Sequence, residues 1–192
     1  SITVIMGRVN GVYAAAQNVV CTITTVSFMV PLAIANSAAV KVGFANGAKD
    51  FFSLRHYAYT AMGMSVIFMA GSAVFVGIFP GVLISLFTKD SALVEVGIPV
   101  MYILCFFQVF DGLQVTLAGI FRGLKQTGIV MLANFIAYWL IALPLGCTLA
   151  LHYKFNLVGF WYGLIVAAII LCTIMFTHLM QKFKYLRQLQ RG

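Results

Sequence analysis

The chain has 192 residues, of which 62% are hydrophobic and only 8% are charged. Soluble domains average about 25% charged residues, so this composition excludes an ordinary soluble protein and indicates a helical protein that crosses a membrane several times. The net charge of +8 comes from basic residues dispersed between apolar stretches. This dispersal favours topology signals over nucleic-acid binding.

The N-terminal stretch from Ser1 to Gly7 is apolar but much shorter than the roughly 20 residues that a spanning helix needs. A turn is predicted at Arg8–Gly11. We therefore expect a partial helix at the start of the chain, and a chain that is a fragment of a longer protein.

The first long apolar run, about residues 12–42, is unusually polar for a membrane span. Asn18, Thr22 and Thr25 fall on one side of a helix, and Pro31 predicts a kink because its ring removes a backbone hydrogen bond. A bent helix with a polar stripe suits the wall of a cavity. Hydrogen bonding between packed helices explains the same residues equally well.

Four further spans follow this run. They are expected at about residues 57–79, 93–120, 128–151 and 158–180, with connections at 43–56, 80–91, 122–127 and 152–156. In the second connection, Asp90 or Ser91 can cap the next helix. The prediction is an all-α, polytopic membrane protein with about five full transmembrane helices and the partial helix. Residues 1–181 would form the transmembrane lobe and residues 182–192 a basic tail.

Basic residues predict the orientation of these spans. Nine of the twelve lysines and arginines fall on the side of the C-terminal tail. Because positively charged loops stay in the cytoplasm, the tail should be cytoplasmic.

Asp111 is the only acid deep inside a predicted span, whereas Asp50, Asp90 and Glu95 lie in or beside connections. It precedes Arg122 by a distance of about 16 Å along a helix, which places it near the middle of the bilayer. An ionised carboxylate costs at least roughly 3 kcal/mol there, so such a residue is a candidate functional site.

The neighbours of Asp111 extend this hypothesis. Gln108 and Gln114 are predicted on a shared flank, where their amides would share the carboxyl's hydrogen bonds and leave room for a proton or Na⁺. A neutral Asp that serves only to pack helices is the simpler alternative.

The remaining residues argue against other classes of protein. An aspartyl protease needs two carboxylates and a serine protease needs a base beside its nucleophile, but no second acid and no histidine lies in mid-span. No phosphate-binding loop is present. The four cysteines are dispersed and predict neither disulfides nor a metal site. The chain is therefore not expected to be an enzyme.

Several motifs together resemble multidrug and toxic compound extrusion (MATE) transporters, closest to the NorM-like bacterial branch. Gly119-Ile-Phe-Arg-Gly123, after Phe110-Asp-Gly-Leu-Gln114, resembles the tenth helix of that family. The other matching motifs, assigned to the eighth, eleventh and twelfth helices, are Ala14–Gln17, Phe28–Pro31, Val42–Ala48, Leu143–Gly146 and Gly159–Gly163.

This resemblance implies that the chain is the C-terminal lobe, from the end of helix 7 to helix 12, of a twelve-helix transporter with two lobes. Family members export drugs and organic cations in exchange for sodium or protons, and have no other cofactor. Asp111 matches the coupling carboxylate, and Gln17 and Asp90 match positions near the substrate cavity in some members. Asn18, on the polar stripe of the first long run, is expected at the same cavity. The expected location is the bacterial inner membrane.

Three departures limit what the resemblance implies. The N-terminal lobe and the seventh-helix acid of the NorM-like branch are absent from the chain. Phe107 stands where some sodium-coupled relatives have tyrosine, so the choice between Na⁺ and H⁺ stays open. Two other functions also stay open: a lipid-linked oligosaccharide flippase of the same superfamily, and a structural membrane subunit without transport activity.

Overall fold

The computed structural model of the chain describes residues 2–85, 91–142, 144 and 156–189, and these are almost entirely helical. The predicted all-α membrane fold is therefore confirmed for the described residues. The elements are α1 (Ile2–Gly47), α2 (Phe51–Ile78), α3 (Pro80–Ser85), α4 (Ser91–Gly123), α5 (Thr127–Phe135), the π-helical segment η1 (Ile136–Ala142) and α7 (Asn156–Leu189).

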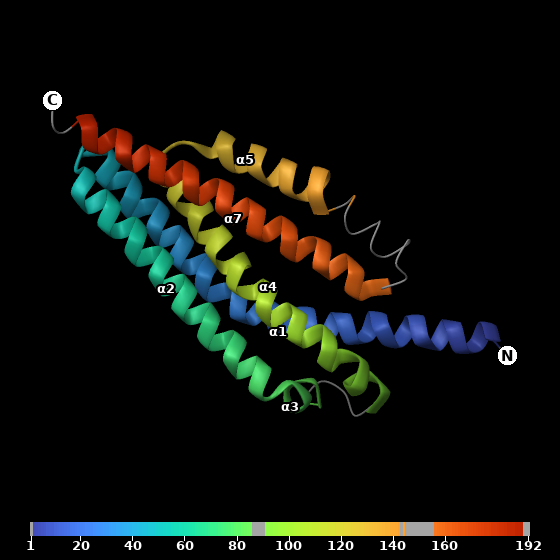
Figure 1. The fold of residues 1–192 in the computed structure, drawn as a ribbon. Coiled ribbons are helices and arrows are strands. Elements are labelled where there is room, and N and C mark those ends of the chain that lie inside the picture. The colour runs from blue at the N-terminus through green and yellow to red at the C-terminus, as the bar shows by residue number, and fades with distance from the viewer. Residues whose placement is uncertain (1, 86–90, 143, 145–155, 190–192) are drawn as a thin grey trace.

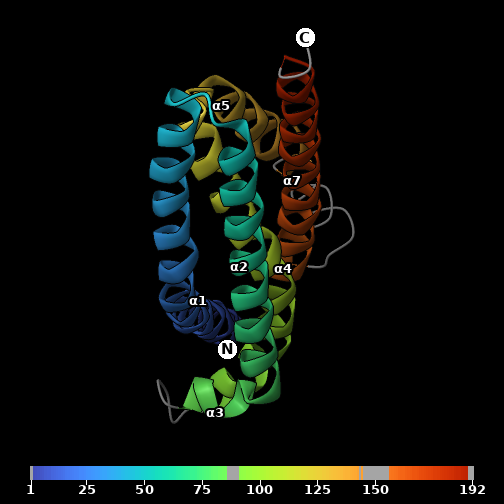
Figure 2. The same cartoon turned by 90° about the vertical axis from the view of Figure 1, so that its left-hand side faces the viewer.

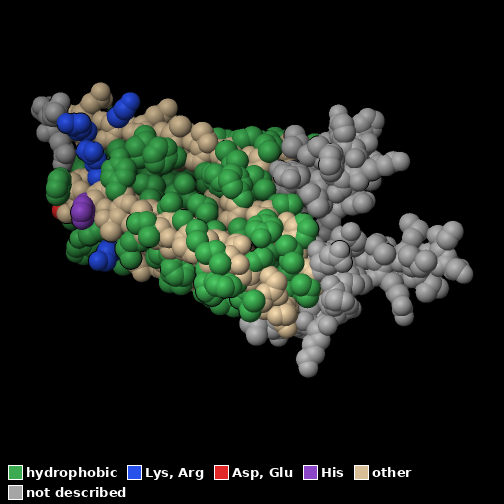
Figure 3. All heavy atoms as spheres, turned by 60° about the horizontal axis from the view of Figure 1, so that its bottom comes forward, with side chains coloured by type: hydrophobic (Ala, Val, Ile, Leu, Met, Phe, Trp, Pro, Cys, Tyr) green, Lys and Arg blue, Asp and Glu red, His purple; other side chains and the backbone are tan. Residues whose placement is uncertain are grey.

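Membrane-length helices dominate this fold. The four described segments that are long and apolar enough to cross a bilayer are Thr24–Gly47, Phe51–Ile78, Met101–Gly123 and Gly163–Gln188. The shorter apolar stretch Thr127–Ala142 begins the predicted fourth span, and most of the remainder of that span lies outside the described residues. Figure 3 shows hydrophobic side chains over much of the described surface on the face that it presents. The chain is a multi-pass membrane protein.

The N-terminal turn predicted at Arg8–Gly11 is wrong, because α1 continues without a break through 46 residues. These positions contain no proline, and glycine lowers helix stability by only about 1 kcal/mol relative to alanine. The connection predicted at residues 43–56 is also much shorter in the structure. It consists of Ala48–Asp50, since α1 ends at Gly47 and α2 begins at Phe51.

Two tight connections reverse the chain at the same end of the molecule. Lys49 and Lys125 both adopt left-handed backbone conformations, with φ of 56° and 57°. Beside them, the backbone N–H of Asp50 donates to Ala45 O at 3.0 Å, and that of Gln126 donates to Phe121 O at 2.9 Å. This pattern ends a helix by satisfying its last carbonyls, so each reversal needs only a few residues.

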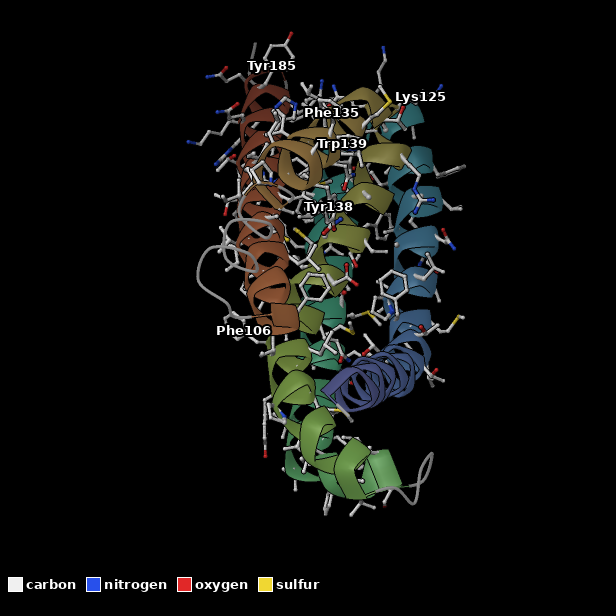
Figure 4. The ribbon with its side chains drawn as sticks, turned by 90° about the vertical axis from the view of Figure 1, so that its right-hand side faces the viewer. Phe106, Lys125, Phe135, Tyr138, Trp139 and Tyr185 are labelled. Atoms are coloured by element: carbon white, nitrogen blue, oxygen red, sulfur yellow. The ribbon has the colours of Figure 1, made fainter. Side chains whose placement is uncertain are left out.

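The long helices run side by side in alternating directions, as Figures 1 and 2 show. α1 packs most extensively against α4, and α2 and α7 pack against other parts of α4. Figure 1 shows that the C-terminal ends of α1, α4 and α7 and the N-terminal ends of α2 and α5 lie together. We call this the basic end, because Lys and Arg side chains gather there in Figure 3, and Figure 4 shows Lys125 there.

Glycines bring α1 and α4 into direct backbone contact. A Cβ added at Gly119 would overlap the carbonyl oxygen of Ala35, and one added at Gly123 would lie 2.7 Å from Ala39 O and 2.9 Å from Gly43 N. Ala35, Ala39 and Gly43 follow each other at four-residue intervals, so they form one ridge of α1. The Gly119–Gly123 motif, which has the GxxxG spacing, therefore serves close helix packing.

Buried apolar side chains form a main core around α4 in the half of the bundle that includes the basic end. Its fully buried members include Leu54 of α2, Leu117 and Phe121 of α4, and Leu171 and Leu179 of α7. A smaller cluster of Val76, Ile84, Met101 and Leu104 joins α2 and α3 to the first half of α4. These two clusters hold α4 in place on either side of its central polar residues.

Candidate functional site

Asp111 lies in α4 within the membrane-length segment Met101–Gly123, and its side chain is half-buried. Within the described part of the chain its carboxyl accepts no hydrogen bond and forms no ion pair. It lies close enough to Tyr138 of η1 and Cys172 of α7 to interact electrostatically with both. The carboxyl is thus positioned by the helix that carries it and has acceptor capacity left for a ligand.

Gln114 joins α4 to the next helix on one side of Asp111. Its side-chain amide donates to Asn134 Oδ1 at 3.2 Å and to the hydroxyl of Tyr138 at 3.2 Å. The same hydroxyl can instead donate to Gln114 Oε1, at 3.3 Å. Asn134 in turn donates to the carbonyl of Val130 at 2.8 Å. This network, which we call the Gln114 cluster, joins side-chain oxygens of α4, α5 and η1. Its Tyr138 is the member that interacts electrostatically with Asp111.

Gln108 points to the other side of α4, toward α2. It is 2% exposed, and its amide donates to Ser72 Oγ at 2.8 Å and lies 3.9 Å from Met69 Sδ. The sequence predicted that the two glutamines share one flank, but in the structure they do not. Six residues turn a helix by about 240°, so Gln108 and Gln114 lie on opposite flanks of Asp111, and both amides are engaged elsewhere.

A hydrogen-bonded chain links Gln108 to Ser27 of α1, one turn before Pro31. Ser72 Oγ donates to Ser27 Oγ at 2.9 Å, which connects α4, α2 and α1 through three side chains. Ser27 precedes Pro31 by four residues, and its carbonyl is the one to which Pro31 cannot donate. Figures 1 and 2 show that α1 bends along its length, in agreement with the predicted kink. Through this chain, Gln108 is tied to the helix that contains the bend.

Sequence reasoning missed the residues that other helices bring to this part of α4. Tyr138 and Cys172 lie near Asp111, and Asn134 contacts Gln114. Asn134 and Tyr138 are one turn apart, so a polar pair within an apolar span was a visible signal. Tyr138 lies in π-helical η1, and such segments are frequent at functional sites because the wider turn displaces side chains. Figure 4 labels Tyr138 together with its neighbour Trp139. Cys172 donates to the carbonyl of Phe110 at 3.3 Å. Nothing in the sequence around Cys172 indicated that it lies near Asp111.

The three residues predicted at the substrate cavity have no described side-chain position. Gln17 and Asn18 belong to α1, but their side chains fall outside the described residues, and Asp90 lies wholly outside them. Their place at a cavity stays a prediction.

The chemistry of the site fits a hard cation or a proton. Asp111 offers a carboxylate, and the Gln114 cluster offers amide and hydroxyl oxygens, each with a further lone pair. Na⁺ and similar ions prefer oxygen ligands of this kind. Among the described residues no group of three or more His, Cys, Asp or Glu side chains is placed to hold a metal ion, so a zinc-type centre finds no support there.

Comparison with known proteins identifies the family. A family model described as MatE matches residues 1–148. The chain belongs to the MatE family. This assignment agrees with the MATE resemblance found in the motifs around Asp111 and Gly119.

The relatives of this MatE chain include bacterial proteins named for drug resistance. It is 35% identical over 177 residues to the "Probable multidrug resistance protein NorM" of Mesorhizobium japonicum, which covers 87% of the chain and 38% of that protein. It is also 35% identical over 164 residues to the "Multidrug resistance protein NorM" of Burkholderia vietnamiensis, with 83% and 36% covered. The chain thus spans less than half the length of these relatives.

Solved MATE structures have the same fold. The eukaryotic MATE transporter AtDTX14 superposes with a TM-score of 0.83 at 21% identity, over 93% of this chain and 41% of that one. A MATE structure described as being in the bent conformation superposes with a TM-score of 0.84 at 15% identity, over 93% and 39%. At these identities the likeness shows the fold of this MatE chain and not its substrates.

Proposed function

We propose that this chain forms the C-terminal lobe of a cation-coupled antiporter that exports drugs and organic cations. It would work in the bacterial inner membrane with its C-terminus in the cytoplasm and with an N-terminal lobe as its partner. Asp111 is the coupling residue, flanked by Gln108 and Gln114. The family membership and the names of the NorM relatives support export of this kind.

The observation that carries the proposal is the half-buried carboxyl of Asp111 in the middle of a membrane-length helix, which has no partner among the residues that the structure describes. If Asp111 only held helices together, its carboxyl would be expected to hydrogen-bond to a neighbouring helix. In the structure the helix contacts on both sides are made by Gln108 and Gln114 instead. The carboxyl is therefore left available for a mobile cation or proton.

Exchange follows from competition for this one negative charge. An ionised carboxylate away from water is costly, so a proton, a Na⁺ ion or an organic cation neutralises it. Two cations that need the same carboxyl cannot occupy it together. Binding of one in the outward-facing state and of the other in the inward-facing state couples their movement, provided that each ligand binds the two states with different affinity.

The Gln114 cluster suits a cation that enters beside Asp111, because its Tyr138 lies near the carboxyl and its other members, Gln114 and Asn134, carry amide oxygens. Gln108 has a different part in the mechanism that we propose. It holds α4 against Ser72 and, through it, against α1. Through these hydrogen bonds, substrate binding at Asp111 would affect the position of the bent helix α1.

The experiment that tests the proposal is Asp111→Asn in the protein as it occurs in the cell. Asparagine keeps the shape of the side chain and removes the charge. We expect loss of the efflux of a fluorescent organic cation such as ethidium, and loss of the Na⁺- or H⁺-driven component of that efflux. The matched control is Asp50→Asn, which alters an acid at the N-cap of α2 outside the membrane spans and should leave efflux intact.

The amount of protein in the membrane separates the alternatives. A structural subunit predicts that Asp111→Asn lowers the amount of assembled protein without a separate transport defect. A lipid-linked oligosaccharide flippase predicts transport of an anionic lipid and no drug efflux. Intact efflux with unchanged ion dependence in Asp111→Asn would refute the coupling role.

A further inference from the structure

A cavity of about 380 Å³ opens at the basic end between the start of α2 and the end of α7. Its size is within the range of small-molecule sites, about 300–1,000 Å³. The residues that line it are Arg55, Tyr59, Met180, Phe183, Lys184 and Arg187. Those on α2 are four residues apart, and those on α7 follow a spacing of three and four. Each helix therefore presents one face to the cavity.

Three of these six side chains are cations. Arg55, Lys184 and Arg187 form no ion pair or hydrogen bond within the described part of the chain. The Nε–H of Arg55 is buried and donates to no acceptor there. A buried donor without an acceptor is costly, and Asp50, the described acid nearest to Arg55 in sequence, already caps α2 through Ser53. An anion with oxygen acceptors would therefore satisfy the cationic donors that line the cavity.

The remaining walls are apolar and already ordered. The rings of Tyr59 and Phe183 lie 5.7 Å apart, and the Tyr59 hydroxyl contacts Met180 Sδ at 3.3 Å. One turn further into the span from Met180, Phe176 is 42% exposed. The cavity therefore has cations at the membrane surface and apolar side chains toward the bilayer interior.

We propose that this cavity binds the phosphate headgroup of an anionic phospholipid. The arginines would hold the phosphate oxygens by charge-assisted hydrogen bonds, Lys184 would add a third positive charge, and an acyl chain would lie along the apolar face that includes Phe176. Two features favour a lipid over a soluble phosphate: the cavity lies at the ends of spanning helices, and its charged and apolar parts follow the polarity of a lipid. Basic clusters beside membrane spans recognise anionic lipids in this way.

The test is lipid binding by the purified protein in a neutral detergent. Phosphatidylglycerol and phosphatidylcholine are titrated separately, and bound lipid is counted by native mass spectrometry. We expect preferential binding of phosphatidylglycerol, and about fivefold weaker binding in Arg55→Gln or Arg187→Gln, which is the factor expected for one basic residue near an anionic headgroup. Arg55→Lys, which keeps the charge but not the bidentate geometry, should retain part of the affinity.

Lys182→Gln is the matched control, because Lys182 lies two residues before Lys184 on α7 but its ammonium lies 5.7 Å from the centre of the Tyr185 ring, and it does not line the cavity. Its affinity for phosphatidylglycerol should stay unchanged. Equal losses in Lys182→Gln and Arg187→Gln would show a diffuse charge effect and overturn the site. A final arm adds inorganic phosphate at the lipid's concentration. If phosphate alone displaces the lipid, the occupant is a free anion and the lipid assignment fails. Arg187→Gln, an exposed position, keeps the test valid if Arg55→Gln does not fold.

Discussion

Replacing Gly119 with alanine tests whether direct backbone contact holds α1 and α4 together. An added Cβ would overlap the carbonyl oxygen of Ala35 and lie 2.8 Å from its Cα, whereas ordinary contact begins at 3.4 Å. These atoms belong to the backbone, so no side-chain rotation can relieve the overlap. The two helices would have to separate, and the contacts between Gly123 and α1 would loosen with them.

The cost follows from two opposing effects. Overpacking of this kind typically destabilises a protein by about 1–3 kcal/mol. Alanine also stabilises a helix interior by about 0.5–1 kcal/mol relative to glycine. The net loss therefore lies between about 0 and 2.5 kcal/mol. Since 1 kcal/mol changes the unfolding temperature of a chain of this size by about 2–4 °C, we expect Gly119→Ala to lower Tm by up to roughly 10 °C.

The assay is thermal unfolding of the purified protein in detergent, with Gly43→Ala as the control. Gly43 lies in the same interface, but an added Cβ there would meet Gly123 O at 3.5 Å, an ordinary contact. Gly43→Ala should leave Tm unchanged or raise it slightly. If Gly43→Ala lowers Tm as much as Gly119→Ala, or if Gly119→Ala raises Tm, the close-contact argument is wrong.

Two further variants test local interactions. Ser72→Ala removes the acceptor of the buried Gln108 amide and should cost about 1–3 kcal/mol, measured by thermal unfolding. Ser85→Ala, at an exposed position, should cost little, and equal effects would argue against the network. Hydrogen bonds from Ser53 lower the pKa of Asp50, so its cap stabilises α2 above the carboxyl's unfolded pKa and this stabilisation is lost as pH falls through the lowered folded value. Asp50→Ala should therefore lower Tm at neutral pH, and the difference in Tm between the variant and the unchanged protein should become smaller in acid. A Tm difference that does not depend on pH would contradict this.

Hydrophobic composition and the residues that interrupt the apolar runs predicted much of the fold. Apolar runs of membrane length, with breaks at Pro80 and after Arg122, located the long helices correctly. The errors fell where glycine and asparagine suggested turns, at Arg8–Gly11 and after Gly43. In α1 these residues remain helical, and Gly43 instead contributes to the contact with α4. A single sequence does not distinguish a glycine that ends a helix from one that allows two helices to touch.

The candidate site was predicted only in part. Asp111 stood out because an acid in mid-span is costly wherever the other helices lie. The opposite orientations of Gln108 and Gln114 follow from helix geometry alone and could have been foreseen. The approach of Asn134 and Tyr138 from the next helix depends on how α5 and η1 pack against α4, which local sequence does not determine.

Because α1 is long, a small change in its bend angle would produce a large displacement at its N-terminal end. The part of the helix between Ile2 and Pro31 would measure about 44 Å at 1.5 Å per residue. A change of about 10° in the bend at Pro31 would therefore move the far end of the helix by about 8 Å. The segment after Pro31, held against α4 by Gly119 and Gly123, would hardly move. An angular adjustment too small to disturb the glycine contacts thus becomes a displacement larger than a helical turn at the other end of the same helix.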